Sequence, residues 1–408
     1  MAPIGMLWSS DALRKERDAL RVLASGRKVS TLTTPVAAPR QWLASTTHVR
    51  DACCMTRAGD SASLRIDRIR ASKQFADGAF RNTKGTPPTM PSKPLPLIGE
   101  YFFGDVQRNP PGPLPLVRPH EAWLKAPDTG FRMTWLGHST VLLELDGRRV
   151  LTDPVFGERV SPVGFAGPKR FHPVPASLLE LPPLDAVVLS HNHYDHLCRS
   201  TMEELAKASV PIITALGVGA DLERFGIPAA RITELDWNES KDLAGLRITA
   251  TPSQHFSGRG MTDRNKTLWA SWVIQSERRK VFFSGDTGLT SEFEAIGQAH
   301  GPFDLVMLEV GAFHPSWGTI HLGPENALAA FAMLGGGTLL PVHWGTFNLA
   351  LHGWDEPAET LMALAQEQRA RIITPRLGAA LEPERIEGVT PWWREVVAPE
   401  GAPSPCCA

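Results

Sequence analysis

The sequence predicts an α/β fold with sheets inside and helices outside. Three observations support this prediction: early strand-like segments separated by tight turns, later alternation of strand-like and helical segments, and metal-competent side chains that recur directly after predicted strands. Such alternation is typical of layered domains, because each amphipathic element buries its apolar face against another layer.

The chain divides into four segments. Residues 1–75 are basic and lack a sustained apolar period, so we expect a poorly ordered extension. Residues 76–130 are rich in proline, which precludes long helices and central strands. Aromatic residues between the prolines predict an extended arm that packs on the core; a Pro-rich interaction tract is the alternative. Residues 131–395 form the predicted compact domain, and residues 396–408 form a tail.

Local patterns place the elements of the compact domain. Apolar and β-branched segments predict strands at 133–136, 140–145, 149–152, 184–189, 211–214, 246–251, 269–275, 280–284, 305–309, 338–342 and 371–374. Helical spacing predicts helices at 202–208, 292–299, 324–334 and 357–369. Asp146-Gly147 predicts a type I′ hairpin between the second and third strands. Ser200 and Glu203 have capping-box spacing at the start of the first helix.

The densest functional signal is the run Ser-His-Asn-His-Tyr-Asp-His-Leu at 190–197. It follows a predicted buried strand and precedes a predicted helix, so it lies in a loop at the carboxyl end of a strand. There, His191 and His193 can face one cation while Asp195 and His196 face a second. Imidazole nitrogens with a few carboxylates suit zinc. A solvated loop or a single structural zinc site is the alternative.

Three residues farther along the chain extend this cluster. His255, Asp286 and His343 each stand just beyond a predicted strand, as the first cluster does. Alone, each would more often be a structural residue. Their repeated placement at strand ends predicts that they join the same site.

These motifs resemble those of the metallo-β-lactamase superfamily. Within it, the chain is similar to the branch of N-acyl-phosphatidylethanolamine-hydrolysing phospholipase D and its bacterial relatives, over roughly residues 75–378. The segments that carry the resemblance are Thr134-Trp135-Leu136-Gly137-His138-Ser139-Thr140, His191 to Leu197, Asp263-Arg264-Asn265-Lys266-Thr267-Leu268-Trp269, Ser284-Gly285-Asp286-Thr287-Gly288 and His343-Trp344-Gly345-Thr346-Phe347.

The resemblance implies a four-layer αββα sandwich with the site at one edge of its sheets. It also implies two Zn²⁺ ions. One would be held by His191, His193 and His255, the other by Asp195, His196 and His343, with Asp286 bridging both. Di-iron relatives that do redox chemistry usually have a carboxylate at the position of His193, so hydrolysis is favoured here.

We therefore expect a zinc-dependent hydrolase, most simply a phosphodiesterase of phospholipase D type that uses a hydroxide between two metals. Asp195 is a ligand that can also orient the hydroxide, and His321 is the candidate general acid or phosphate donor. His138 and Asp153 are candidates for orienting the ligands. A hydrolase of lactones, esters or other carbonyl substrates is the alternative, and a non-catalytic metal-binding module is a third interpretation.

The substrate prediction depends on one departure from the phospholipase pattern. That enzyme has Gly-Ala-Tyr-x-Pro-Arg where this chain has Gly311-Ala312-Phe313-His314-Pro315-Ser316, so the tyrosine and arginine are missing. Four large aromatic residues either line an apolar substrate channel or pack in the core: Trp317, Trp344, Phe347 and Trp354.

Composition limits the partners. A formal net charge of −1 gives no field that would attract nucleic acid, so we expect a small-molecule or phospholipid substrate and no nucleic-acid partner. The five cysteines include two vicinal pairs and predict no disulfide framework, which favours a cytoplasmic protein. We find no signal peptide and no transmembrane run. Peripheral membrane contact and homo-oligomerisation stay open.

Overall fold

The computed structural model describes residues 58–83, 106–314 and 319–397. Its first sheet contains seven strands: β3 (Phe131–Gly137), β4 (Thr140–Leu145), β5 (Arg148–Thr152), β6 (Ala186–Leu189), β7 (Ile212–Ala215), β8 (Ile232–Leu235) and β15 (Ala380–Leu381). The second contains six: β9 (Ser240–Leu243), β10 (Leu246–Thr251), β11 (Ser271–Gln275), β12 (Lys280–Phe283), β13 (Leu305–Glu309) and β14 (Leu339–Val342). A short hairpin precedes them, formed by β1 (Phe75–Ala76) and β2 (Ala79–Phe80).

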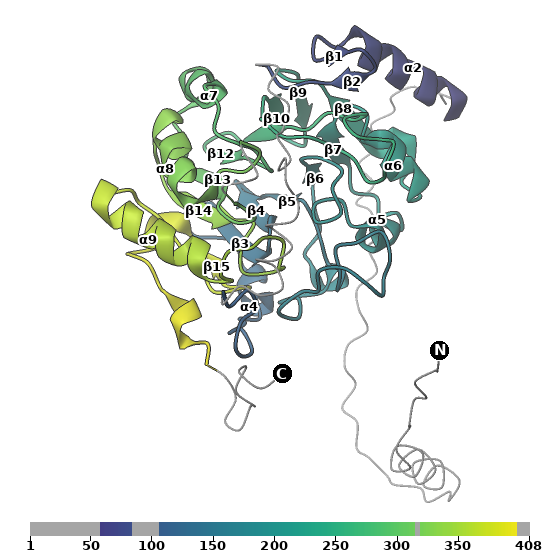
Figure 1. Cartoon of the computed structure of the whole chain (residues 1–408). Helices are drawn as coiled ribbons and strands as arrows, with labels where there is room; N and C mark the ends of the chain where they lie inside the picture. The colour runs from purple at the N-terminus through teal and green to yellow at the C-terminus, as the bar shows by residue number, and fades with distance from the viewer. Residues whose placement is uncertain (1–57, 84–105, 315–318, 398–408) are drawn as a thin grey trace, which may run out of the picture. The chain divides into compact units, whose positions relative to one another are not determined.

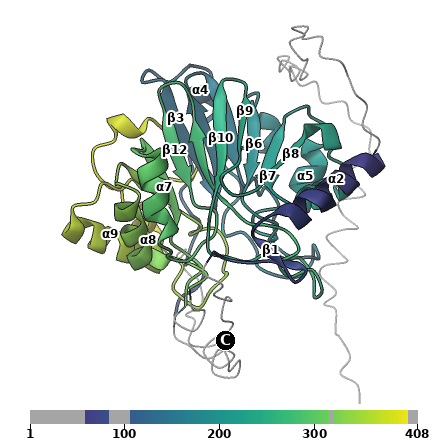
Figure 2. The ribbon, with the colours of Figure 1, turned by 90° about the horizontal axis from the view of Figure 1, so that it is seen from above.

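Helices cover the sheets. They are α2 (Ala58–Ala71), α4 (His120–Trp123), α5 (Arg199–Leu205), α6 (Gly219–Arg224), α7 (Glu292–His300), α8 (Gly323–Met333) and α9 (Glu356–Gln368). Helices α7, α8 and α9 lie on one side of the strands and α5 on the other, as Figures 1 and 2 show. Both sheets contribute to one buried apolar core. The predicted four-layer α/β sandwich is therefore confirmed.

Strand direction explains where the site forms. In the first sheet, β3 and β5 to β8 run the same way, because two antiparallel pairings separate β3 from β5 and the later pairings are parallel. In the second sheet, β10, β12, β13 and β14 share one direction for the same reason. The carboxyl ends of these strands therefore meet at one edge of each sheet.

Tryptophan side chains pack beside this edge. Trp344 stacks on Trp135 with ring centroids 5.3 Å apart and on Trp392 at 5.5 Å. All three are buried, as is Trp354. Packing in the core therefore accounts for Trp344 and Trp354, and Trp317 lies outside the described residues.

Several predicted elements hold and others need correction. Asp146 and Gly147 both have positive φ, as the type I′ hairpin requires. Helix α5 begins at Arg199, one turn earlier than predicted, and its N-cap Cys198 makes no side-chain capping bond. The prediction of a capping box is therefore wrong. Ser200 lies inside the helix and not at its N-cap, and its hydroxyl lies 3.3 Å from the Cys198 thiol.

Polar edge strands escaped the sequence pattern. Strands β8 and β9 were not predicted, because Ile232–Leu235 is only half-buried and Ser240–Leu243 is largely exposed, so neither shows an apolar period. Conversely, residues 371–374 form a single parallel bridge, between Ile372 and Leu339, and no strand.

The N-terminal extension contains an ordered helix. Helix α2 lies inside the range for which weak order was predicted, and the buried guanidinium of Arg65 bonds Glu223 at 2.6 Å and Glu234 at 2.5 Å. These long-range ion pairs have no local sequence signal, so the prediction is wrong for this helix. Residues 1–57 lie outside the described part of the chain. No helix of the described residues is long and apolar enough to cross a bilayer.

Candidate metal centre

One group of ligand atoms forms where β6, β10 and β12 end. His191 Nε2 lies 2.8 Å from His193 Nδ1, which in turn lies 3.2 Å from His255 Nε2. Two nitrogen ligands of a tetrahedral zinc ion lie roughly 3.3 Å apart, given Zn–N distances of about 2.0–2.1 Å. We call His191, His193 and His255 the first group; with Asp286, they can hold a metal ion.

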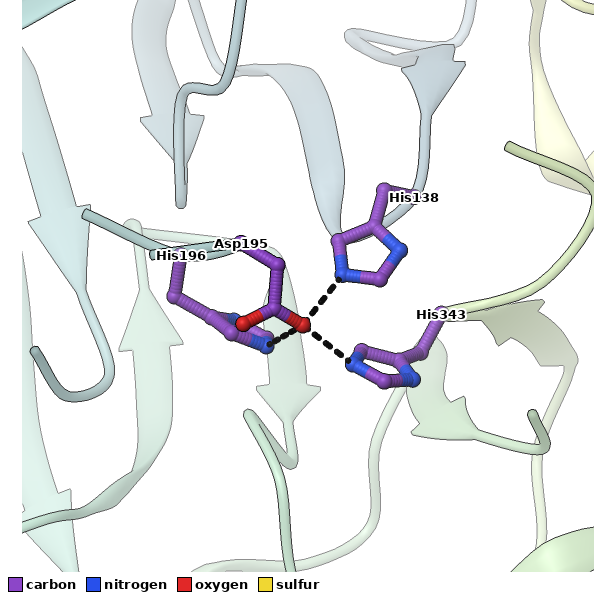
Figure 3. Close-up of side chains that lie close together, drawn as sticks. All are labelled: His138, Asp195, His196 and His343. Atoms are coloured by element: carbon purple, nitrogen blue, oxygen red, sulfur yellow. Dashed lines mark hydrogen bonds and ion pairs between the residues drawn. The ribbon is translucent and has the colours of Figure 1, made fainter. Parts of the chain in front are cut away.

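A second group forms beside it from the same loop and from the end of β14. Asp195 Oδ2 lies 3.4 Å from His196 Nε2 and 3.2 Å from His343 Nε2. Figure 3 shows these two imidazoles and that of His138 converging on the same carboxylate oxygen. We call Asp195, His196 and His343 the second group.

Asp286 stands between the two groups. Its Oδ1 lies 3.0 Å from His196 Nε2 and 3.3 Å from His343 Nε2, in the second group. Its Oδ2 lies 3.8 Å from His191 Nε2 and 3.7 Å from His255 Nε2, in the first group. Each oxygen of one carboxylate therefore faces a different group. All seven predicted ligands come together.

Outer hydrogen bonds set the imidazole tautomers. Ser190 Oγ donates its only hydrogen to Asp153 Oδ2 at 2.6 Å, so it can accept from His191 Nδ1, 2.9 Å away. Asp153 Oδ2 also accepts from His196 Nδ1 at 2.7 Å. Both rings therefore carry a proton on Nδ1 and direct Nε2 inward, as metal-binding histidines do when an outer acceptor orients them. The predicted orienting role of Asp153 agrees with this geometry.

Two other residues support the centre from further strand ends. His138, after β3, lies with Nε2 3.1 Å from Asp195 Oδ2, so it is the donor to this carboxylate. Glu309, at the end of β13, accepts from His321 Nδ1 at 2.6 Å and from the Thr287 N–H at 2.7 Å. Glu309 was not among the predicted site residues, although it is the last residue of a predicted strand. The other late ligands also lie close to the ends of predicted strands.

The two groups differ in electrostatics. Burial holds the pKa values of His191 and His255 well below the usual range, and lowers that of His193 to about 4. Burial also opposes charge on His196 and His343, but nearby carboxylates, Asp286 foremost, raise both pKa values, that of His343 to about 10. Asp286 and Asp195 thus outweigh the desolvation that opposes charge on these two imidazoles.

Backbone strain accompanies the site. His138, Asp153 and His343 have φ values of 52°, 31° and 66°, in the left-handed region that non-glycine residues seldom adopt. Each such residue costs about 1–3 kcal/mol and persists only where its surroundings impose it. The left-handed backbone at these three strand ends accompanies side chains that converge on one small volume.

The donor set fits two divalent cations. His196 Nε2 and Asp286 Oδ1 are buried, and neither has a hydrogen-bond partner in the described part of the chain although they lie 3.0 Å apart. Buried polar atoms of this kind require an explanation. Lone pairs that face a shared cation supply one, and nitrogen and carboxylate donors in this ratio suit zinc.

Comparisons with known proteins agree with this geometry. A family model described as "Beta-lactamase superfamily domain" matches residues 148–344. An uncharacterized protein of Mycobacterium tuberculosis is 43% identical over 341 residues, which cover 82% of this chain and 91% of that protein. The chain belongs to the metallo-β-lactamase superfamily. Its general activity is accordingly that of a metal-dependent hydrolase of this superfamily.

More specific relatives lie within the superfamily. N-acyl-phosphatidylethanolamine-hydrolyzing phospholipase D 1 of Caenorhabditis elegans is 39% identical over 234 residues, which cover 54% of this chain and 66% of that enzyme. Among solved structures, an isothiocyanate hydrolase from Delia radicum gut bacteria aligns with a TM-score of 0.50 and 23% identity, covering 62% of this chain and 98% of that one. At this identity the alignment shows the shared fold alone.

Proposed function

We propose that the protein is a zinc-dependent phosphodiesterase of phospholipase D type. The observation that carries the proposal is the placement of Asp286, whose two oxygens face two complete groups of ligands. A two-cation centre suits a phosphodiester, which develops charge on both its attacking and its leaving oxygen. The similarity to the Caenorhabditis elegans phospholipase supports this substrate class.

The protein's residues divide the work as follows. When bound, two zinc ions supply a hydroxide nucleophile near neutral pH and offset the charge of the phosphodiester. The two groups, with Asp286, would hold the ions, and Asp195 would in addition orient the attacking hydroxide. All of these side chains are buried or nearly so, which strengthens their electrostatic effect on the reacting group.

His321 is the proposed general acid. Burial opposes its protonation, but the charge and hydrogen bond of Glu309 raise its pKa above the ordinary value. Because Nδ1 is held by Glu309, the proton that His321 could deliver to a leaving alkoxide sits on Nε2. A proton donor positioned in this way typically contributes about 10²–10⁴-fold to the rate.

A cavity beside His321 offers room for the substrate. It has a volume of about 370 Å³ and combines apolar side chains, among them Phe313 and Leu322, with polar ones, among them Asn326 and Thr360. Phe313 stands where the phospholipase pattern has tyrosine. This departure favours the second candidate function, hydrolysis of a lactone, an ester or another carbonyl substrate.

A substrate panel tests the proposal. Purified protein is analysed for metal by mass spectrometry and assayed with bis-p-nitrophenyl phosphate, N-acyl-phosphatidylethanolamine, aryl esters and lactones. We expect about two zinc ions per chain, phosphodiester turnover and its loss in Asp286→Asn. Turnover confined to esters or lactones would establish the second candidate. Two bound ions with no turnover of any compound would favour a metal-binding module.

A further inference from the structure

An N-terminal strap reaches the metal centre from outside the matched domain. We define the strap as residues 58–83, which comprise helix α2, the β1–β2 hairpin and the segment that follows it. Its Phe80 is fully buried, and the Phe80 N–H donates to the Asn265 carbonyl at 2.8 Å. The Lys266 ammonium donates to the Gly78 carbonyl at 2.5 Å. The strap is thus fixed against the loop that carries His255.

Asn82 makes the decisive contacts. Its Nδ2 donates to the His255 carbonyl at 3.1 Å, and its Oδ1 accepts from the His255 N–H at 3.1 Å. The same Oδ1 accepts from Trp269 Nε1 at 3.0 Å. Asn82 is only 8% exposed, so water does not replace these bonds readily. One side-chain amide therefore binds both backbone polar groups of a single ligand residue, as a neighbouring strand would.

His255 needs such a partner because its own strand has ended. The pairing of β10 with β11 stops at Thr251 and Ser271, four positions before His255. Buried backbone N–H and C=O groups without partners are costly. The ring is held separately, since His255 Nδ1 lies 2.9 Å from the Ile320 carbonyl. Asn82 thus fixes the backbone from which the ring projects, while Ile320 fixes the ring.

We infer that Asn82 is a positioning residue for the first group, and that the strap is part of the metal centre. The inference rests on the two-metal centre of the proposed function. His255 belongs to the first group and not to the second. Loss of Asn82 should therefore weaken the binding of the ion in the first group and leave the binding of the other ion unchanged. Removal of residues that orient metal ligands typically lowers metal affinity about 10–100-fold.

Competition with a chelator tests this inference. The full-length zinc protein and its Asn82→Ala variant are titrated with a chromogenic chelator. We expect one ion of the variant to leave at about 10–100-fold lower chelator activity, and the second to leave as in the wild type. Lys266→Ala is the matched control, because it removes a strap contact that does not touch His255, and it should leave both ions unchanged. Equal loosening of both ions, or of neither, would overturn the inference.

An isosteric variant separates hydrogen bonding from packing. Asn82→Asp keeps the shape and the acceptor but replaces the donor to the His255 carbonyl by an oxygen, so it should also release one ion early. In the cobalt-substituted protein, the visible absorption of one ion should change and that of the other should persist. Wild-type metal retention and an unchanged spectrum in Asn82→Asp would contradict the inference. Because the readout is metal release and not turnover, an incorrect substrate class would not alter it.

Discussion

The two ligand groups share Asp286 but solve different electrostatic problems. The first presents three imidazoles whose pKa values are lowered, so its rings are neutral at neutral pH and each can offer one unprotonated nitrogen to a cation. The second presents two imidazoles against Asp195 and Asp286, and its imidazoles hold protons in the absence of a cation. Binding in the first group therefore requires mainly desolvation of the ion, whereas binding in the second also requires proton release.

Removal of Asp286, which the two groups share, should have the largest effect on metal content and turnover, because it affects both groups at once. Asp286→Ala deletes the carboxylate whose two oxygens face the two groups. We expect loss of both ions and a fall in phosphodiester turnover of about 10³-fold or more, since several kcal/mol of charge stabilisation disappear. Metal analysis and steady-state kinetics measure the two effects. Two retained ions in this variant would show that the groups are independent.

A substitution in one group should remove one of the two ions and leave the other. His193→Ala affects the first group and His343→Ala the second, so each should lower the metal content from about two ions to about one. Turnover should fall about 10²-fold or more in both, because each ion contributes charge stabilisation. Tyr194→Phe is the control, since Tyr194 lies in the same loop but its hydroxyl bonds the Arg259 carbonyl. A loss of both ions from either variant would contradict separate sites.

Lowering the pH should weaken zinc binding in the second group before it weakens zinc binding in the first. A ligand with a raised pKa loses its proton only as the pH rises, so affinity in the second group should increase with pH, by about tenfold per pH unit for each proton displaced. His343, with a pKa of about 10, and His196 are the residues concerned. The first group should stay nearly constant between pH 8 and 6. Zinc calorimetry across this range, in buffers of different ionisation enthalpy, measures both slopes. Equal slopes would refute the contrast.

The smallest expected effect concerns an outer partner of the second group. His138→Leu removes the donor to Asp195 Oδ2 and should lower the affinity of one ion about tenfold. Asn82→Ala should instead lower the affinity of the other ion, so the two variants are expected to affect different ions. Chelator titration of both variants and of the double variant should give additive results. Loosening of the same ion by both variants would show that the assignment of partners to groups is wrong.

Much of the centre could be predicted because its signals are local. Three histidines and an aspartate within six residues stand out in any chain, and the later ligands each follow an apolar strand. Glu309 is the last residue of a predicted strand, but a lone glutamate at a strand end is too common to single out. Asn82 had no local signal, since its partner His255 is 173 residues away and the bonds run to backbone atoms.

The sequence by itself determined the ligand types, their order and the strand ends that carry them, because periodicity and short spacing are properties of the local chain. Only the tertiary structure decided how the ligands divide and what holds them. Strand direction brings separate loops to one edge, left-handed backbone at His138 and His343 turns their rings inward, and Asp286 faces both groups. These features depend on pairing between distant segments, which the free energy of the whole fold selects and which no single segment encodes.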